Sequence, residues 1–135
     1  MIAVDSSALL AILLNEPEAP ACIEALIDAT SSYVSSFTLF ETRVVIQRVA
    51  AHDGLADLAI LLERSRVLTV PFDDEQAAVA LDAYRRYGKG IHPAGLNIGD
   101  CASYALAKSR NLPLLFKGND FARTDIASAL ESGTG

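Results

Sequence analysis

The chain has 135 residues, of which 51% are hydrophobic and 21% are charged, a balance typical of a folded globular protein rather than a disordered one. Its formal net charge of −6 at pH 7 argues against a protein that holds nucleic acid through a broad basic surface, although a bound cation would still allow it to recruit phosphate. No apolar run is long enough for a membrane span and no basic segment precedes the apolar N-terminus, so we expect one cytoplasmic domain over residues 1–135.

The first residues predict a buried strand that leads into a helix. Ile2–Val4 is a short apolar run, which favours a strand covered on both faces of a parallel sheet, and Asp5 ends it. Ser6 or Ser7 can cap the helix that follows, and Asp5 is the alternative cap. Because Asp5 comes directly after the first strand, it lies at the edge where open α/β sheets place their ligands. A buried carboxylate needs a cation or hydrogen-bond donors, so Asp5 is a candidate metal ligand.

Short strands and helices alternate along the rest of the chain. Further strands are predicted at residues 33–35, Val67–Val70 and 114–116. Helices are predicted at residues 22–30, from Ser36 or Thr38 to Ala51, at 55–64, from Asp73 or Asp74 past Tyr84, and at 99–110, with a left-handed stop at Gly54, a short final segment at 122–130 and frayed residues after it. This alternation indicates an α/β fold, an α/β/α sandwich around a central parallel sheet of four to five strands.

Four acidic residues are expected at one edge of this sheet. Asp5 and Asp120 follow strands, Glu41 lies early in the helix after the second strand, and Asp100 begins a later helix. The carboxyl ends of parallel strands share an edge with the N-termini of the following helices, which stabilise negative charge. Carboxylates without a Cys or His pair favour Mg²⁺ or Mn²⁺, ions that can activate water to cleave a phosphodiester. Each acid also has a structural explanation: Glu41 as a solvated residue, Asp100 as a helix cap and Asp120 as a turn former.

Four segments of the sequence resemble a known family. They are Val-Asp-Ser-Ser-Ala-Leu at residues 4–9, Phe-Glu at 40–41, Gly-Asp-Cys-Ala-Ser-Tyr-Ala-Leu-Ala at 99–107 and Leu-Phe-Lys-Gly-Asn-Asp-Phe at 115–121. Over nearly the whole chain they resemble PIN-domain ribonucleases and, more narrowly, the VapC toxins of type II toxin–antitoxin modules. The resemblance implies a PIN-like fold and a Mg²⁺-dependent endoribonuclease, with Mn²⁺ as a substitute ion. It also implies a homodimer and neutralisation by a cognate VapB-type antitoxin.

The same resemblance assigns roles to individual residues. Asp5 and Asp100 would be the main metal ligands, Glu41 would complete the ligand set or hold metal-bound water, and Asp120 would be the fourth acid. The match is loosest at Asp120, because the family often spaces its last acid differently before the phenylalanine. Asn119 can assist there through its amide oxygen.

Other polar residues have supporting roles in this interpretation. Ser7 stands where the family commonly has a small hydroxyl or amide residue, which suits support of Asp5. We expect a basic rim for the RNA backbone, although ordinary solvated charges are the alternative. The rim residues are Arg85, Arg86, Lys89, His92 and Lys117.

Arg43 and Arg48, on the predicted helix that carries Glu41, could neutralise a phosphate or the acids. An antitoxin could also inhibit by inserting a basic side chain among the carboxylates, where it would compete with the metal.

Three other functions compete with the ribonuclease interpretation. A haloacid-dehalogenase phosphatase also uses an Asp after its first strand but needs a second acid two residues later, where this chain has Ser7. A receiver-like signalling module that binds Mg²⁺ needs paired acids after strand one and a phosphorylated Asp after strand three, where Pro71 stands. An inactive PIN scaffold that only binds a partner is the third, and the retained acids argue against it.

Overall fold

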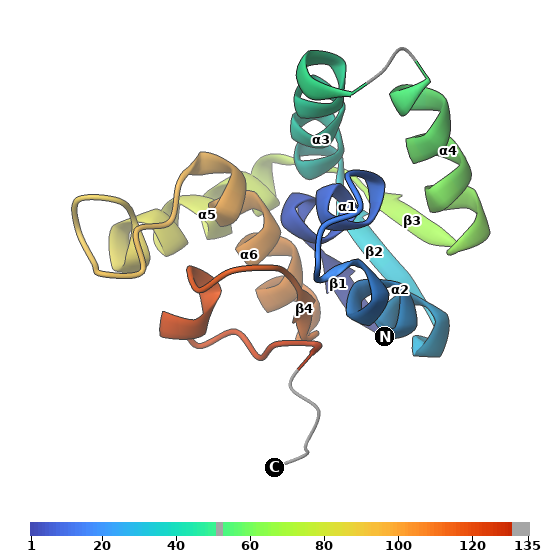
Figure 1. The fold of residues 1–135 in the computed structure, drawn as a ribbon. Coiled ribbons are helices and arrows are strands. Elements are labelled where there is room, and N and C mark those ends of the chain that lie inside the picture. Colours follow the sequence, from blue (N-terminus) through green and yellow to red (C-terminus); the bar gives the residue numbers. More distant parts are fainter. Residues whose placement is uncertain (51–52, 131–135) are drawn as a thin grey trace.

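The computed structural model describes residues 1–50 and 53–130, in which strands and helices alternate (Figure 1). The strands are β1 (Ile2–Val4), β2 (Ser32–Ser35), β3 (Val67–Val70) and β4 (Leu114–Leu115). The helices are α1 (Ser6–Leu13), α2 (Ala19–Asp28), α3 (Ser36–Val49), α4 (Gly54–Arg64), α5 (Asp74–Tyr87) and α6 (Ile98–Arg110), followed by a 3₁₀ turn at Phe121–Arg123. Within the described residues, none of these helices is long and apolar enough to cross a membrane.

The strands form one parallel sheet in the order β3-β2-β1-β4. Ala3 of β1 lies opposite Tyr33 of β2 on one side and Leu114 of β4 on the other. The described sheet thus has four strands, within the four to five that the sequence predicts. Because every pairing is parallel, all strands end at the same edge of the sheet.

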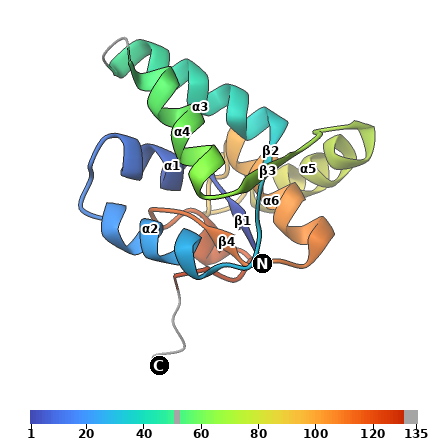
Figure 2. The same ribbon diagram turned by 90° about the vertical axis from the view of Figure 1, so that its right-hand side faces the viewer.

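Helices cover both faces of the sheet, and the side chains of β1 alternate between them. Ile2 and Val4 pack into a core shared with α1, α2 and α4, whereas Ala3 belongs to a second core under α5 and α6. Figures 1 and 2 show α2 and α4 on one side of the strands and α5 and α6 on the other. The predicted α/β/α arrangement is confirmed.

The structure decides between the predicted helix caps. At α1 the alternative cap is confirmed: Asp5 accepts a hydrogen bond of 3.1 Å from the Ser7 backbone N–H, so neither Ser6 nor Ser7 is the cap. Ser35, and not Ser36 or Thr38, caps α3. In both helices the cap is the last residue in extended conformation. Because each strand leads directly into its helix, this residue precedes the serines and threonine predicted as caps.

Gly54 does not close α3 in a left-handed conformation. It is the first residue of α4, and α3 ends at Val49. A Cβ on Gly54 would lie 2.7 Å from Ile46 and 2.8 Å from Ala50, so the glycine permits close approach of the two helices. The predicted helix end at Ala51, and the frayed last five residues, lie outside the described residues.

The segment after β4 forms a 3₁₀ turn and then runs alongside β4. The backbone N–H of Leu114 donates to the carbonyl of Ala127, and that of Ala129 donates to Leu114. Asp125 fastens this segment to α6, because it accepts hydrogen bonds from the Tyr104 hydroxyl at 2.6 Å and the Lys108 ammonium at 2.8 Å. The outer edge of β4 is therefore covered by the chain itself.

Candidate active site: an acidic cluster at the carboxyl edge of the sheet

The four predicted acids lie at the carboxyl edge of the sheet, near enough for their charges to interact. Asp5 follows β1 directly, Glu41 lies on α3 behind β2, Asp100 is in the first turn of α6, and Asp120 follows β4. Burial raises the pKa of Asp100, and the negative charges of Asp5, Asp120 and Glu41 raise it further, so all three act on Asp100. We call these four residues the acidic cluster.

Asp5 is the most buried member, with 3% of its surface exposed. Its Oδ1 accepts a hydrogen bond of 2.5 Å from the Ser103 hydroxyl, and its Oδ2 accepts one of 2.6 Å from the Ser7 hydroxyl. The Ser7 oxygen in turn accepts from the backbone N–H of Lys117 at 2.9 Å, which ties the end of β1 to the residues after β4. The carboxylate is thus held from both sides by donors.

Asp100 has a structural and an electrostatic role. It forms a capping box with Asn97: its Oδ2 accepts from the Asn97 N–H at 3.1 Å, and its own N–H donates to Asn97 Oδ1 at 2.8 Å. Burial, followed by the charges of the other three acids, raises the pKa of Asp100 to about 7 in spite of that hydrogen bond. The negative charge of Asp100, unlike that of Asp5, is therefore poorly compensated by the protein's own groups.

Glu41 is half-buried and lies against the backbone of α6. Burial and the charge of Asp5 raise its pKa, and a hydrogen bond from the Ser6 side chain opposes this shift. Gly99 is buried, and a Cβ built on it would collide with the Glu41 carboxylate. Glycine at this position thus makes the room that Glu41 occupies.

We expect Gly99→Ala to lower activity at the cluster about tenfold without lowering the melting temperature. The new methyl group would push away the end of a flexible Glu41 side chain, while Ala favours the helix over Gly by about 1 kcal/mol. Cleavage rates and thermal melts of the variant test this. If the effect runs through Glu41, Gly99→Ala adds nothing to a Glu41→Gln background, and additive losses would contradict the explanation.

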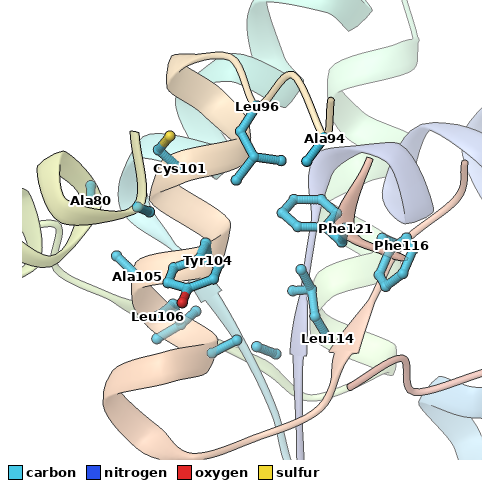
Figure 3. Packing of buried hydrophobic residues seen from close by; sticks show 13 residues of the cluster. Ala80, Ala94, Leu96, Cys101, Tyr104, Ala105, Leu106, Leu114, Phe116 and Phe121 are labelled. Carbon is cyan, nitrogen blue, oxygen red and sulfur yellow. The ribbon is translucent and has the colours of Figure 1, made fainter. Parts of the chain in front are cut away.

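Asp120 is exposed, in a short loop fixed at both ends. Phe116 and Phe121 flank the loop, both are buried, and their ring centroids are 5.1 Å apart. Figure 3 shows the two rings beside Leu114. The exposed Asn119 precedes Asp120 in this loop, so the packing of the phenylalanines fixes where both polar side chains can reach.

The donor chemistry of the cluster suits a hard divalent cation, although its geometry is not that of a closed metal site. Among residues 1–50 and 53–130, no three His, Cys, Asp or Glu side chains are arranged so that they could hold an ion together. Burial and, after it, the charges of the other three acids raise the pKa of Asp100, and a nearby cation would favour its ionised form. The residues present therefore fit Mg²⁺ or Mn²⁺ in charge and in ligand type, with Asp5 and Asp100 as the candidate ligands.

Two of the predicted RNA-binding residues contact the protein's own groups. Arg86 lies 3.7 Å from Asp125, donates to the Tyr104 hydroxyl at 3.4 Å and stacks over the Tyr87 ring. Lys117 pairs with Glu16 at 2.9 Å.

The remaining rim residues lie at and after the end of α5. Arg85 and Lys89 are exposed. The His92 ring nitrogen Nδ1 accepts from the Ala94 N–H at 3.0 Å, which shapes the loop before α6.

An apolar groove between α3 and α4 leads to the cluster. It has a volume of about 560 Å³. Phe40, Val44 and Arg48 also line an adjoining recess of about 510 Å³ that contains Glu41 and Gly99. The groove itself is lined by Phe40, Arg43, Val44, Gln47, Arg48, Leu55, Leu58, Ala59 and Leu62.

The chain is similar to known proteins in sequence and in fold. The model of the PIN domain family matches residues 2–127. A protein named Ribonuclease VapC from Mycolicibacterium smegmatis is 47% identical over 125 residues, which cover 93% of this chain and 97% of the relative.

Two solved structures are similar to the chain. Mycobacterium tuberculosis VapC20, a Sarcin-Ricin loop cleaving toxin, shares the fold with a TM-score of 0.78 at 15% identity, covering 94% of this chain and 97% of that one. VapBC-5 from the same organism, described as a member of the VapBC family of toxin-antitoxin systems, has a TM-score of 0.63 at 28% identity, covering 95% and 93%. The chain therefore belongs to the PIN-domain family and, within it, to the VapC ribonucleases.

Proposed function

We propose that this protein is a divalent-metal-dependent endoribonuclease that acts as the toxin of a type II toxin–antitoxin system. The observation that carries the proposal is the gathering of Asp5, Glu41, Asp100 and Asp120 at one sheet edge, in a chain 47% identical to a named ribonuclease. The same membership does not favour a phosphatase, a receiver-like module or an inactive scaffold. Ser7, where a phosphatase needs its second acid, is bonded to Asp5 instead.

Mg²⁺, with Mn²⁺ as a substitute, would be held by Asp5 and Asp100 and would activate water and stabilise charge on the phosphodiester. Glu41, which lines the recess beside Gly99, would accept a hydrogen bond from the attacking water. Ser7 orients Asp5, and the exposed Asp120 adds a fourth carboxylate next to Asn119. The protein's part in the chemistry is to hold these groups in place before the substrate arrives.

RNA would lie along the rim of the cluster. Arg85 and Lys89 are exposed and can contact phosphates directly. Arg86 and Lys117 can do so only by exchanging their present acidic partners for the backbone of the RNA. An RNA substrate also supports a cytoplasmic location.

A test of the activity is incubation of a mixed RNA pool with the purified protein. We expect cleavage with Mg²⁺ and none with EDTA. Equal cleavage under both conditions would contradict the metal dependence.

The α3–α4 groove supports a VapB-type antitoxin as partner. It is apolar along its floor and carries Arg43 and Arg48, so it suits an amphipathic segment with an apolar face and acidic flanks. Because the groove shares residues with the recess at Glu41, a segment bound there could extend a basic side chain to the carboxylates.

We expect Leu55→Asp to weaken binding of the antitoxin encoded beside this protein by at least about tenfold, since a charge would enter an apolar groove. Leu55 is 42% exposed, so the fold should tolerate the change. Ile23→Asp, at a position on α2 with 41% exposure, is the matched control and should bind normally. Titration calorimetry measures both affinities, and an equal loss in the two variants would argue against the groove.

A homodimer would cover a second apolar surface. A pocket of about 340 Å³ beside α5 is lined by residues that include Phe72, Leu81, Tyr84 and Ile98. Ile98 is 71% exposed, which is costly for an isolated chain. Light scattering coupled to size exclusion would report the dimer.

A further inference from the structure

A buried chain of hydroxyl groups connects Asp5 to helix α3. The Ser103 oxygen lies 2.5 Å from Asp5 Oδ1 and 3.1 Å from the Thr38 hydroxyl. Ser103 is 1% exposed and Thr38 is fully buried. A hydrogen bond therefore joins Asp5 and Ser103, which are 98 positions apart in the sequence, and a second hydrogen bond joins Ser103 to Thr38 on α3.

The direction of these hydrogen bonds follows from the number of protons available. The Asp5 carboxylate can only accept, so the single hydroxyl proton of Ser103 is donated to it. Ser103 then has only lone pairs left for Thr38, and Thr38 must be the donor in the second bond. The chain thus runs from Thr38 through Ser103 to Oδ1 of Asp5, and each bond polarises the other.

Neither the Thr38 nor the Ser103 hydroxyl makes the hydrogen bond that is usual for a buried Ser or Thr in a helix. Buried Ser and Thr residues in helices commonly donate to the backbone carbonyl four residues earlier. Thr42, one turn after Thr38 and equally buried, does this by donating to the Thr38 carbonyl at 2.8 Å. Ser103 and Thr38 instead direct their protons toward Asp5.

We propose that Thr38 and Ser103 are positioning residues, which hold the Asp5 carboxylate in the orientation that takes a divalent ion. The inference rests on the proposed function. Ser7 holds Oδ2 and Ser103 holds Oδ1, so the carboxylate cannot turn freely. Ser103 lies one turn after Asp100 on α6, and the helix that presents one candidate ligand therefore also fixes the other.

The test compares isosteric and hydroxyl-retaining variants. Thr38→Val keeps the shape and removes the donor, whereas Thr38→Ser keeps the donor and removes a buried methyl group. Thr42→Val is the matched control. It is the same substitution on the same helix, at an equally buried hydroxyl that is not hydrogen-bonded to Ser103 or Asp5. Mn²⁺ affinity by calorimetry, kcat and KM for RNA cleavage, and melting temperature are measured for each.

We expect Thr38→Val to weaken Mn²⁺ binding and lower kcat about tenfold, and Ser103→Ala to do so by up to about 100-fold, with KM for RNA little changed. Thr38→Ser should melt at a lower temperature yet bind Mn²⁺ normally, and Thr42→Val should keep both Mn²⁺ affinity and kcat. Adding Thr38→Val to Ser103→Ala should cost nothing further, because Thr38 acts only through Ser103.

Several outcomes overturn the inference. If wild type binds Mn²⁺ and cleaves RNA but Thr38→Val behaves like Thr42→Val, the hydroxyls are structural and the proposed function stands. A wild-type protein that neither binds Mn²⁺ nor cleaves RNA overturns the proposed function and this inference with it. Should Thr38→Val fail to fold, Mn²⁺ affinity and kcat of Ser103→Ala are compared with those of Thr42→Val. Equal values in these two variants would overturn the inference.

Discussion

Asp100→Asn should lower kcat/KM for RNA cleavage by at least about 1,000-fold while the fold is retained. The substitution preserves size and leaves an amide oxygen to accept the Asn97 N–H of the capping box. It removes the carboxylate on which the charges of Asp5, Glu41 and Asp120 converge, and with it the charge that a divalent ion needs. The effect is chemical rather than structural.

Cleavage of a defined RNA by wild type and variant at saturating Mg²⁺ measures this loss, with circular dichroism to verify folding. Asp28→Asn is the matched control, since Asp28 is an exposed acid at the end of α2. We expect the control to cleave like wild type. If Asp100→Asn retained most of the activity, Asp100 would not be a catalytic residue.

The same substitution should stabilise the metal-free protein at neutral and higher pH. The pKa of Asp100 is raised from 3.8 to about 7 in the folded protein. Between these values the folded state keeps a proton that the unfolded state has released, so stability falls as pH rises from about 4 to about 7. Below this window both states are protonated, and above it the full penalty is present.

In EDTA we therefore expect Asp100→Asn and wild type to melt together near pH 4. At pH 8 the variant should be more stable by about 1–2 kcal/mol, a figure reduced to allow for solvent screening of a partly exposed carboxyl. Added Mg²⁺ should reverse the order, because it stabilises only the protein that binds it. Parallel melting curves for the two proteins from pH 4 to pH 8 in EDTA would contradict the electrostatic account of the cluster.

Much of the fold follows from local sequence patterns, and the exceptions have identifiable physical causes. Ile2–Val4 and Val67–Val70 form strands because short apolar runs bounded by polar or proline residues leave few alternatives. The cap at Ser35 lies one residue or more before the predicted positions because extended conformation continues to the last residue before α3, and the same effect makes Asp5 rather than Ser6 or Ser7 the cap of α1. Gly54 serves close packing of α3 and α4, a contact that no local pattern encodes.

Some features of the candidate site could likewise be predicted from the sequence, and others could not. The positions of the acids after strands and at helix starts made their convergence predictable, because parallel topology brings those points to one edge. Ser103 gave no signal, since it stands in an alanine-rich helix and meets Asp5 only through the tertiary fold. The partners of Arg86 and Lys117 were equally hidden, because Asp125 and Glu16 lie far from them along the chain.

A crystal structure of the protein soaked in Mn²⁺, with anomalous scattering to locate the ion, tests the central claim most directly. The account predicts an anomalous peak within coordination distance of carboxylate oxygens of both Asp5 and Asp100. No peak at the carboxyl edge of the sheet at millimolar Mn²⁺, or a peak bound by other residues, would contradict it.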